Sequence, residues 1–119
     1  MTHLINNQWL TGNGPAFDSV NPANNDILWQ GQGADEQQVD AAIMAARKAF
    51  PAWSLSSYED RLVMVKAFQA QLKDKAEELA IAIAQETGKP LWETLTEAGA
   101  MAGKIDLSAR AYEERTGVV

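Results

Sequence analysis

The sequence contains no cysteine, and His3 is its only histidine. A chain without cysteine forms no disulfide, offers no thiolate to a metal and has no thiol nucleophile. One histidine in a terminal segment supplies neither a histidine-centred catalytic pair nor a cluster of metal ligands. Acidic residues are plentiful, but the pairs at 77–78 and 113–114 fall where solvated helix faces are expected. The sequence therefore shows no catalytic or metal-binding constellation of its own.

Basic residues and long apolar runs are also scarce. The chain of 119 residues has 10 Lys and Arg against 16 Asp and Glu, which gives a net charge of -6. Nucleic acids and anionic lipids are bound by clustered Lys and Arg, so neither is an expected partner. No apolar stretch approaches the roughly 20 residues of a membrane span, and the first residues do not resemble a signal peptide. We therefore expect a cytoplasmic protein.

Residues 1–33 alternate short β-favouring pieces with turn-forming residues. Leu4-Ile5 and Trp9-Leu10 flank Asn6-Asn7, and later pieces are separated by Asn24-Asn25-Asp26. Short runs bounded by Asn, Asp, Gly and Pro are typical of small strands and hairpins. We predict strands and turns, not a helix, in this segment.

The glycine pairs Gly12/Gly14 and Gly31/Gly33 are the only places that suggest a phosphate-binding loop. A dinucleotide fingerprint needs a third glycine, a preceding buried strand and a following helix. Because neither pair has the third glycine, we interpret both as ordinary turns.

A helical period begins near Asp35, which can serve as an N-cap with Gln38 three residues on. Pro51 should end this helix, so we predict a helix over 35–50. Ser56 followed by Glu59 is a second start signal, and it predicts a helix over 57–87. The apolar stripe of this second helix is predicted to be buried; its residues are Val65, Phe68, Leu72, Ala76, Leu79 and Ile83.

Glu86-Thr87-Gly88-Lys89-Pro90 separates the second helix from a third, predicted over 90–116. Gly88 can adopt the left-handed conformation that closes a helix, and Pro90 can open the next one. The third helix contains Gly99 and Gly103. Each costs about 1 kcal/mol relative to alanine, which predicts close packing of this helix against a neighbour.

The order and spacing of these features resemble the N-terminal segment of the NAD(P)-dependent aldehyde dehydrogenase superfamily. The segments that carry the resemblance are 5–9, 20–27, 39–53, 59–61 and 86–90. Within the superfamily, residues 87–117 are most similar to succinylglutamic semialdehyde dehydrogenase of arginine catabolism. The resemblance covers nearly the whole chain but only the opening portion of such an enzyme.

The resemblance implies an α+β, mostly helical protein in which short N-terminal β-hairpins precede three helices. Residues 1–119 would be the N-terminal part of a cofactor-binding domain that lacks its parallel sheet. The parent enzyme would oxidise an aldehyde to a carboxylate with NAD or NADP. The family uses a cysteine nucleophile, which this chain lacks. We therefore expect the 119 residues alone to be inactive and to bind no cofactor tightly.

The resemblance also implies two sets of site residues. In the family, a monovalent cation is often held by a main-chain carbonyl before the Asn-Pro pair and by an acidic residue, which here correspond to Val20 and Glu86. An exposed acid at a helix end is an equally good reading of Glu86. The third helix would border the substrate tunnel with Glu97, Met101 and Lys104. For these, core packing of Met101 and a surface charge at Lys104 are the simpler reading.

An alternative from another class is an autonomous acidic helical module that binds a partner through its apolar stripes. A fragment would expose similar surfaces, because they would be intended for absent parts of the enzyme. A fragment is expected to associate with itself or with the remainder of its parent, whereas a module is expected to be a monomer with a specific partner.

Overall fold

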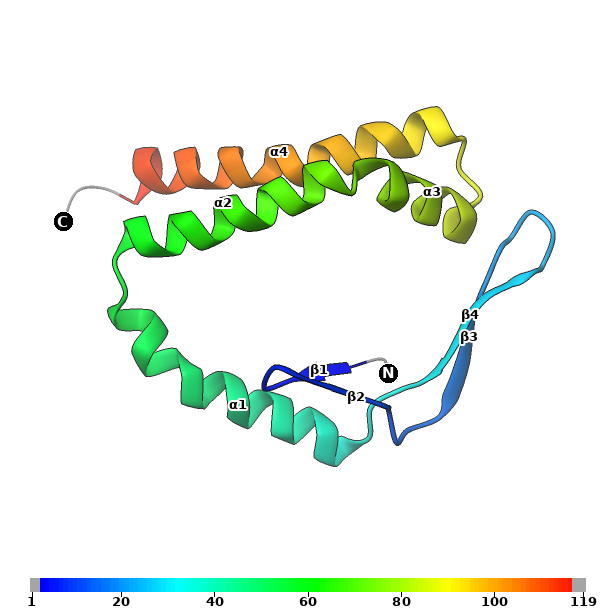
Figure 1. Ribbon diagram of the computed structural model, residues 1–119, viewed down its shortest axis with the longest axis horizontal. Coiled ribbons are helices and arrows are strands. Elements are labelled where there is room, and N and C mark those ends of the chain that lie inside the picture. The colour runs from blue at the N-terminus through cyan, green and yellow to red at the C-terminus, as the bar shows by residue number, and fades with distance from the viewer. Residues whose placement is uncertain (1–2, 117–119) are drawn as a thin grey trace. The chain divides into compact units, whose positions relative to one another are not determined.

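The computed structural model describes residues 3–116, and the chain forms two compact units, Met1–Ser56 and Ser57–Val119 (Figure 1). Gly117, the last residue of the stretch that resembles succinylglutamic semialdehyde dehydrogenase, lies outside the described residues. No helix among residues 3–116 is long and apolar enough to cross a bilayer.

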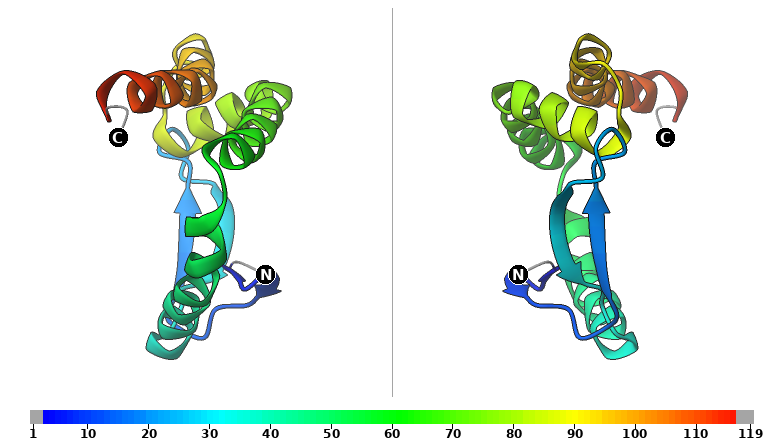
Figure 2. Two further views of the ribbon diagram at one scale, coloured as in Figure 1. Left: turned by 90° about the vertical axis from the view of Figure 1, so that its left-hand side faces the viewer. Right: turned by 90° about the vertical axis from the view of Figure 1, so that its right-hand side faces the viewer.

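The first unit opens with two antiparallel hairpins. Strand β1 (His3–Ile5) pairs with β2 (Gln8–Leu10), and the two-residue turn between them has positive φ at Asn6 (50°) and Asn7 (60°). Asparagine tolerates this conformation better than most residues, which is why the pair forms a tight hairpin turn. Strand β3 (Ala16–Val20) pairs with β4 (Ile27–Gln32). Figure 2 shows this second hairpin as a separate twisted ribbon. The predicted strands and hairpins are confirmed.

Helix α1 (Glu36–Leu55) follows, and its start was predicted correctly. Asp35 accepts a hydrogen bond from the Gln38 amide (2.8 Å), and the Gln38 side chain accepts one from the Asp35 amide (3.2 Å). The predicted end at residue 50 is wrong, because the helix continues through Pro51 to Leu55. Pro51 has no amide hydrogen to donate to the carbonyl four residues before it, and α1 ends within about one turn after this proline.

The second unit contains three helices: α2 (Tyr58–Asp74), α3 (Ala76–Thr87) and α4 (Leu91–Arg115). The single helix predicted over 57–87 is therefore two helices, which meet at Lys75, so that residues 3–116 contain four helices instead of the predicted three. The Lys75 backbone (φ −97°, ψ 11°) leaves the helical conformation. No glycine or proline marks the break, and the apolar period runs through it, so no local signal predicts it.

The helix ends in this unit follow local chemistry. Ser57, not Ser56 as predicted, caps α2, and its hydroxyl accepts the Asp60 amide (3.0 Å). Ser56 instead closes α1. Gly88 adopts the predicted left-handed conformation (φ 74°) after α3. Pro90 stands at the N-cap of α4, within one residue of the predicted start.

Helix α4 packs against both α2 and α3, and the two views of Figure 2 show it beside them. The buried apolar residues of the described chain are small except for one: Ala80, Ala98, Ala102 and Ile105. The stripe predicted to be buried is not, since Val65 and Phe68 are exposed and Leu72 is half-buried. Alanines at the contact let the helices approach closely, whereas Val63, Met64 and Phe68 of α2 are more than half exposed.

Candidate functional site

The two residues proposed for a monovalent cation lie in different units. Val20 ends β3, directly after an irregularity in the strand register between Ser19 and Val20, and pairs with Ile27. Glu86 is exposed in the last turn of α3. Among residues 3–116 no group of three or more Asp, Glu or His is arranged to hold a metal. A site that uses one carbonyl and one carboxylate would take its other ligands from elsewhere, so Val20 and Glu86 stay a prediction.

Glu97, one of the residues proposed for a substrate tunnel, is engaged by the segment before α4. Its carboxylate accepts a hydrogen bond from Lys89 Nζ, which also lies 3.8 Å from a carboxylate oxygen of Glu93. The hydrogen bond to Glu97 raises the pKa of Lys89, with a further contribution from Glu93. Glu97 is thus a paired anion in this structure, and Lys89 is the residue that the sequence reasoning missed. Its spacing of four from Glu93 was the available signal.

Met101 and Lys104 follow Glu97 on the same helix. Met101 is 40% exposed, so it is not a core residue of this chain. Lys104 borders a shallow open depression of α4 that is also lined by Leu107, Arg110, Ala111, Glu114 and Arg115. Three cations and one carboxylate therefore surround this depression. A surface of this kind can attract a carboxylate, but it forms no enclosed pocket.

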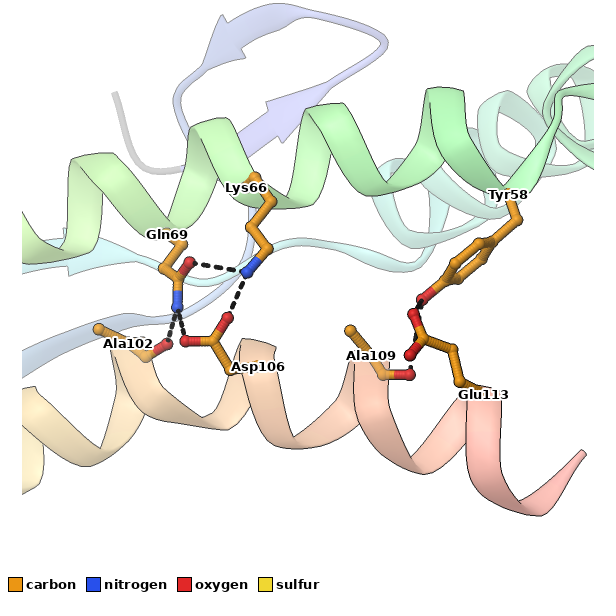
Figure 3. A network of polar contacts seen from close by, with 7 residues as sticks. All are labelled: Tyr58, Lys66, Gln69, Ala102, Asp106, Ala109 and Glu113. Atoms are coloured by element: carbon orange, nitrogen blue, oxygen red, sulfur yellow. Dashed lines mark hydrogen bonds and ion pairs between the residues drawn. The ribbon is translucent and has the colours of Figure 1, made fainter.

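A polar network joins α2 to α4 (Figure 3). Gln69 is buried and donates to the Ala102 carbonyl (2.8 Å) and to Asp106 Oδ2 (2.7 Å). Lys66 donates to the other oxygen of Asp106. Hydrogen bonds from Lys66 and then from Gln69 hold the pKa of Asp106 below its ordinary value. Sequence reasoning missed this network because it assigned the contact face of α2 to apolar residues.

A second polar contact joins the beginning of α2 to the end of α4. The Tyr58 hydroxyl donates to Glu113 Oε1 (3.3 Å), and its ring stacks on Tyr112 with centroids 4.6 Å apart. Desolvation, followed by the charge of Glu113, raises the pKa of Tyr58. Both contacts hold helices together, and neither presents a nucleophile or a base to a pocket.

Gly12 and Gly14 of the first unit lie close to the backbone of the segment around Gly33. A Cβ on Gly12 would lie 2.2 Å from the Gly33 carbonyl oxygen, and one on Gly14 would lie 2.7 Å from that of Ala34. The Gly14 amide donates to the Gly33 carbonyl (2.8 Å). The space that these two glycines leave is filled by the chain's own backbone, and a Cβ on Gly31 would lie 2.2 Å from the Trp29 side chain. Gly12, Gly14 and Gly31 therefore leave no opening for a phosphate. The interpretation of Gly31 as part of an ordinary turn is wrong, because Gly31 lies inside strand β4 and pairs with Phe17.

Comparison with known proteins identifies the class. A model of the aldehyde dehydrogenase family matches residues 9–119, and this chain belongs to that family. It is similar to an NAD-dependent benzaldehyde dehydrogenase from Corynebacterium glutamicum (25% identity, TM-score 0.86), covering 95% of this chain and 25% of that one.

Two further solved structures of similar fold match nearly the same part of this chain. A point mutant of betaine aldehyde dehydrogenase from Staphylococcus aureus, in complex with NAD+, is 26% identical with a TM-score of 0.86, over 97% of this chain and 24% of that one. An E. coli NADP dependent enzyme is 34% identical with a TM-score of 0.84, over 90% and 22%. The chain thus spans about a quarter of the length of these structures.

The fold class is confirmed. The described residues form a mostly helical α+β structure with short N-terminal strand pairs, as in the matching part of these enzymes. The alternative of an autonomous acidic interaction module is not favoured, since the family model matches nearly the whole chain.

Proposed function

We propose that this chain is the N-terminal part of the cofactor-binding domain of an NAD(P)-dependent aldehyde dehydrogenase. The observation that carries the proposal is the family match over residues 9–119, together with superposition on about a quarter of the length of an enzyme of that class. The parent protein would oxidise an aldehyde to a carboxylate, with NAD+ or NADP+ as the hydride acceptor and water as the source of oxygen.

The reactive groups of the parent would lie outside these 119 residues. The chain has no cysteine to form the thiohemiacetal and thioester that a thiolate nucleophile makes. Gly12 and Gly14 are closed by backbone and Gly31 by the Trp29 side chain, so the dinucleotide would be held by other parts of the parent. This chain would contribute a scaffold and one wall of the substrate tunnel, and by itself it would be inactive.

For the substrate we propose succinylglutamic semialdehyde. The support is the similarity of residues 87–117 to that enzyme and the cations beside Lys104, which suit a substrate that carries several carboxylates. Lys104 would attract one of these carboxylates. Met101 would line the tunnel, and the negative charge of Glu97 would be partly offset by Lys89, which also lies near Glu93.

We also propose a bound monovalent cation in the parent, with the Val20 carbonyl and the Glu86 carboxylate among its ligands. Hard oxygen ligands of this kind suit an alkali cation. Potassium should raise the melting temperature of the parent, and Glu86→Gln should remove that effect while Glu77→Gln, on the same helix, keeps it. An equal response in all three proteins would count against the site.

The proposed activity is tested on the parent, meaning the protein encoded by the whole reading frame that contains these 119 residues. Reduction of NAD+ and of NADP+ is followed with succinylglutamic semialdehyde, benzaldehyde and betaine aldehyde. Preference for the first aldehyde supports the full proposal, and preference for another keeps only the class. No reduction with any aldehyde argues against the proposed function.

Lys104→Ala tests the tunnel wall. It should raise the KM for a polycarboxylate aldehyde and leave kcat nearly unchanged, because removing uniform binding affects KM. Lys73→Ala, which removes an exposed lysine from α2, is the matched control. An unchanged KM in Lys104→Ala would contradict the proposed role of this residue.

A further inference from the structure

The segment that joins β2 to β3 contains the sequence Asn13-Gly14, in which an asparagine is followed by a glycine. The backbone nitrogen of a following residue can attack the side-chain amide carbon of an asparagine, which makes asparagine a thermolabile residue. Glycine has no Cβ to crowd this nitrogen, so it obstructs the attack least. Asn13 is the one asparagine of the sequence that precedes a glycine.

The other asparagines are more obstructed. Asn21 precedes a proline, whose nitrogen carries no hydrogen. The side chain of Asn24 is engaged, because it accepts a hydrogen bond from the Asp26 amide (3.0 Å) and donates one to the Asp26 carboxylate (2.6 Å). Three others precede residues whose side chains crowd the attacking nitrogen, namely Asn6, Asn7 and Asn25. Asn13 is therefore the asparagine at which this reaction meets the least obstruction.

The Gly14 nitrogen that would attack is held in the folded first unit. It donates to the Gly33 carbonyl (2.8 Å), and the Gly33 amide donates in turn to the Pro15 carbonyl (2.8 Å). Attack on the Asn13 side chain requires this nitrogen to give up its hydrogen and to turn toward the amide carbon. Because the hydrogen bond to Gly33 has to open first, the folded structure slows the reaction.

Gln38, at the start of α1, holds the same segment from a second side. Its Oε1 accepts a hydrogen bond from the Asn13 amide (2.9 Å), and its Nε2 donates one to the Thr11 carbonyl (2.9 Å). The side chain of Asn13 is not needed for these contacts, and Asn13 is exposed. We call the hydrogen bonds that Gly33 and Gln38 make to residues 11–15 the Asn13 clamp.

We propose that Asn13 is a site of spontaneous deamidation and that the Asn13 clamp sets the rate of this reaction. When the clamp opens, the Gly14 nitrogen loses its proton and forms a bond to Cγ of Asn13. The side-chain nitrogen takes up a proton and leaves as ammonia, and a five-membered succinimide ring remains. Water opens this ring at either of its carbonyl carbons, which gives aspartate or isoaspartate without oxidation or reduction.

Isoaspartate at position 13 is incompatible with the clamp that delays its formation. It places one additional carbon in the backbone between residues 13 and 14, which lengthens the main chain by about 1.5 Å. The segment has no room for this change, since a Cβ on Gly12 would already lie 2.2 Å from the Gly33 carbonyl oxygen. The amides of residues 13 and 14 therefore do not both keep their partners. Aspartate keeps the original backbone and adds one negative charge.

The first test follows the mass of the peptide that contains residue 13 in the full-length parent, stored in a mildly alkaline buffer. In urea, Asn13 should be converted before the other asparagines of residues 1–119. In the folded parent its conversion should be about tenfold slower or more, because several hydrogen bonds have to open. Earlier conversion of another of these asparagines in urea, or equal rates at Asn13 in the folded and unfolded parent, would overturn the proposal.

Substitution of Gln38 tests the clamp in the folded parent. Gln38→Ala removes the hydrogen bonds to Asn13 and Thr11, so deamidation at Asn13 should become about tenfold faster. Gln37→Ala, at an exposed position one residue earlier, is the matched control and should keep the wild-type rate. Gln38→Glu, which still accepts from Asn13 but donates nothing to Thr11, should give an intermediate rate and carries the comparison if Gln38→Ala does not fold. A rate in the folded Gln38 variants equal to that of Gln37→Ala would overturn the proposal.

Amide hydrogen exchange separates the two products. The isoaspartate form should lose protection at the amides of residues 13 and 14, whereas Asn13→Asp, which has the charge but the original backbone, should keep it. Equal protection in the two forms would show that the clamp tolerates the additional carbon. The inference does not depend on the proposed function: a parent that oxidises aldehydes can fail these tests, and an inactive parent can pass them.

Discussion

Replacement of Gln69 tests whether polar groups hold α2 on α4. Gln69 is almost fully buried, and its side-chain amide makes hydrogen bonds of 2.8 Å to the Ala102 carbonyl and 2.7 Å to Asp106. Each hydrogen bond contributes about 1 kcal/mol net, and truncation to alanine adds the cost of a cavity. We expect Gln69→Ala to lower the free energy of unfolding by about 3 kcal/mol.

Gln69→Leu separates the two contributions. Leucine keeps most of the volume but donates no hydrogen bond, so we expect a loss of about 2 kcal/mol from the bonds alone. Gln71→Ala, at an exposed position of the same helix, is the matched control and should change stability by less than about 0.5 kcal/mol.

Urea unfolding of the 119-residue chain, followed by far-UV circular dichroism, measures these differences. Amide hydrogen exchange in α2 and α4 assigns them to the second unit. A Gln69→Leu chain as stable as the wild type, or more so, would refute the reasoning. It would mean that apolar packing at this position replaces the polar bonds without loss.

Three further predictions concern the same unit. Gly99→Ala should stabilise the isolated chain by about 1 kcal/mol, since a Cβ there meets nothing within 4 Å. Gly88→Ala should destabilise the chain by a similar amount, because the φ of Gly88 is 74°. Urea unfolding of both variants should give changes of opposite sign in the free energy of unfolding, and changes of the same sign would contradict the prediction. Because the pKa of Asp106 is lowered from 3.8 on folding, its stabilising contribution is present above about that pH and is lost as the pH falls through the folded-state pKa. Asp106→Asn should therefore flatten the acid limb of a stability–pH profile, and an unchanged limb would show that this carboxylate does not carry it. Lys89→Met should speed amide exchange in the first turn of α4 by removing the partner of Glu97, and Lys89→Arg should restore protection if charge is what matters.

Local signals in the sequence predicted the parts of the fold that depend on local chemistry. The Asp35–Gln38 capping box, the left-handed Gly88 and the Asn6-Asn7 turn all follow from what three to five consecutive residues can do. The same signals misplaced the cap of α2 by one residue, because Ser56 and Ser57 are both followed three residues later by an acid.

The wrong predictions concern features that depend on contacts between residues far apart in the sequence. Nothing in the sequence around Lys75 ends a helix, yet the chain breaks there, and α2 and α3 both pack on α4. An interior proline stops most helices, but α1 continues through Pro51 for about one more turn. The contact face of α2 was assigned to Phe68 and Val65, although Gln69 holds that place. An amphipathic pattern says which residues share a side and does not say which partner each side meets.

For the candidate site, too, some features could be predicted from the sequence and others could not. The motif segments identified the family, which the match over residues 9–119 confirms, because motif order and spacing are properties of the sequence. That Glu97 is paired with Lys89 became visible only in three dimensions, since Lys89 precedes α4 and its side chain has to run along the start of that helix to reach a residue eight positions on.

By itself, the sequence determined the family, the absence of a thiol nucleophile, the hairpins and the ends of several helices. These depend on residue identity and on interactions over a few residues. The tertiary structure decided that a polar network around Gln69 joins α2 to α4 and that small alanines form the contact between the helices of the second unit. The physical reason is that a side chain is buried only when another surface packs on it. The pattern of one helix shows which side chains share a face, but not which other element packs on that face.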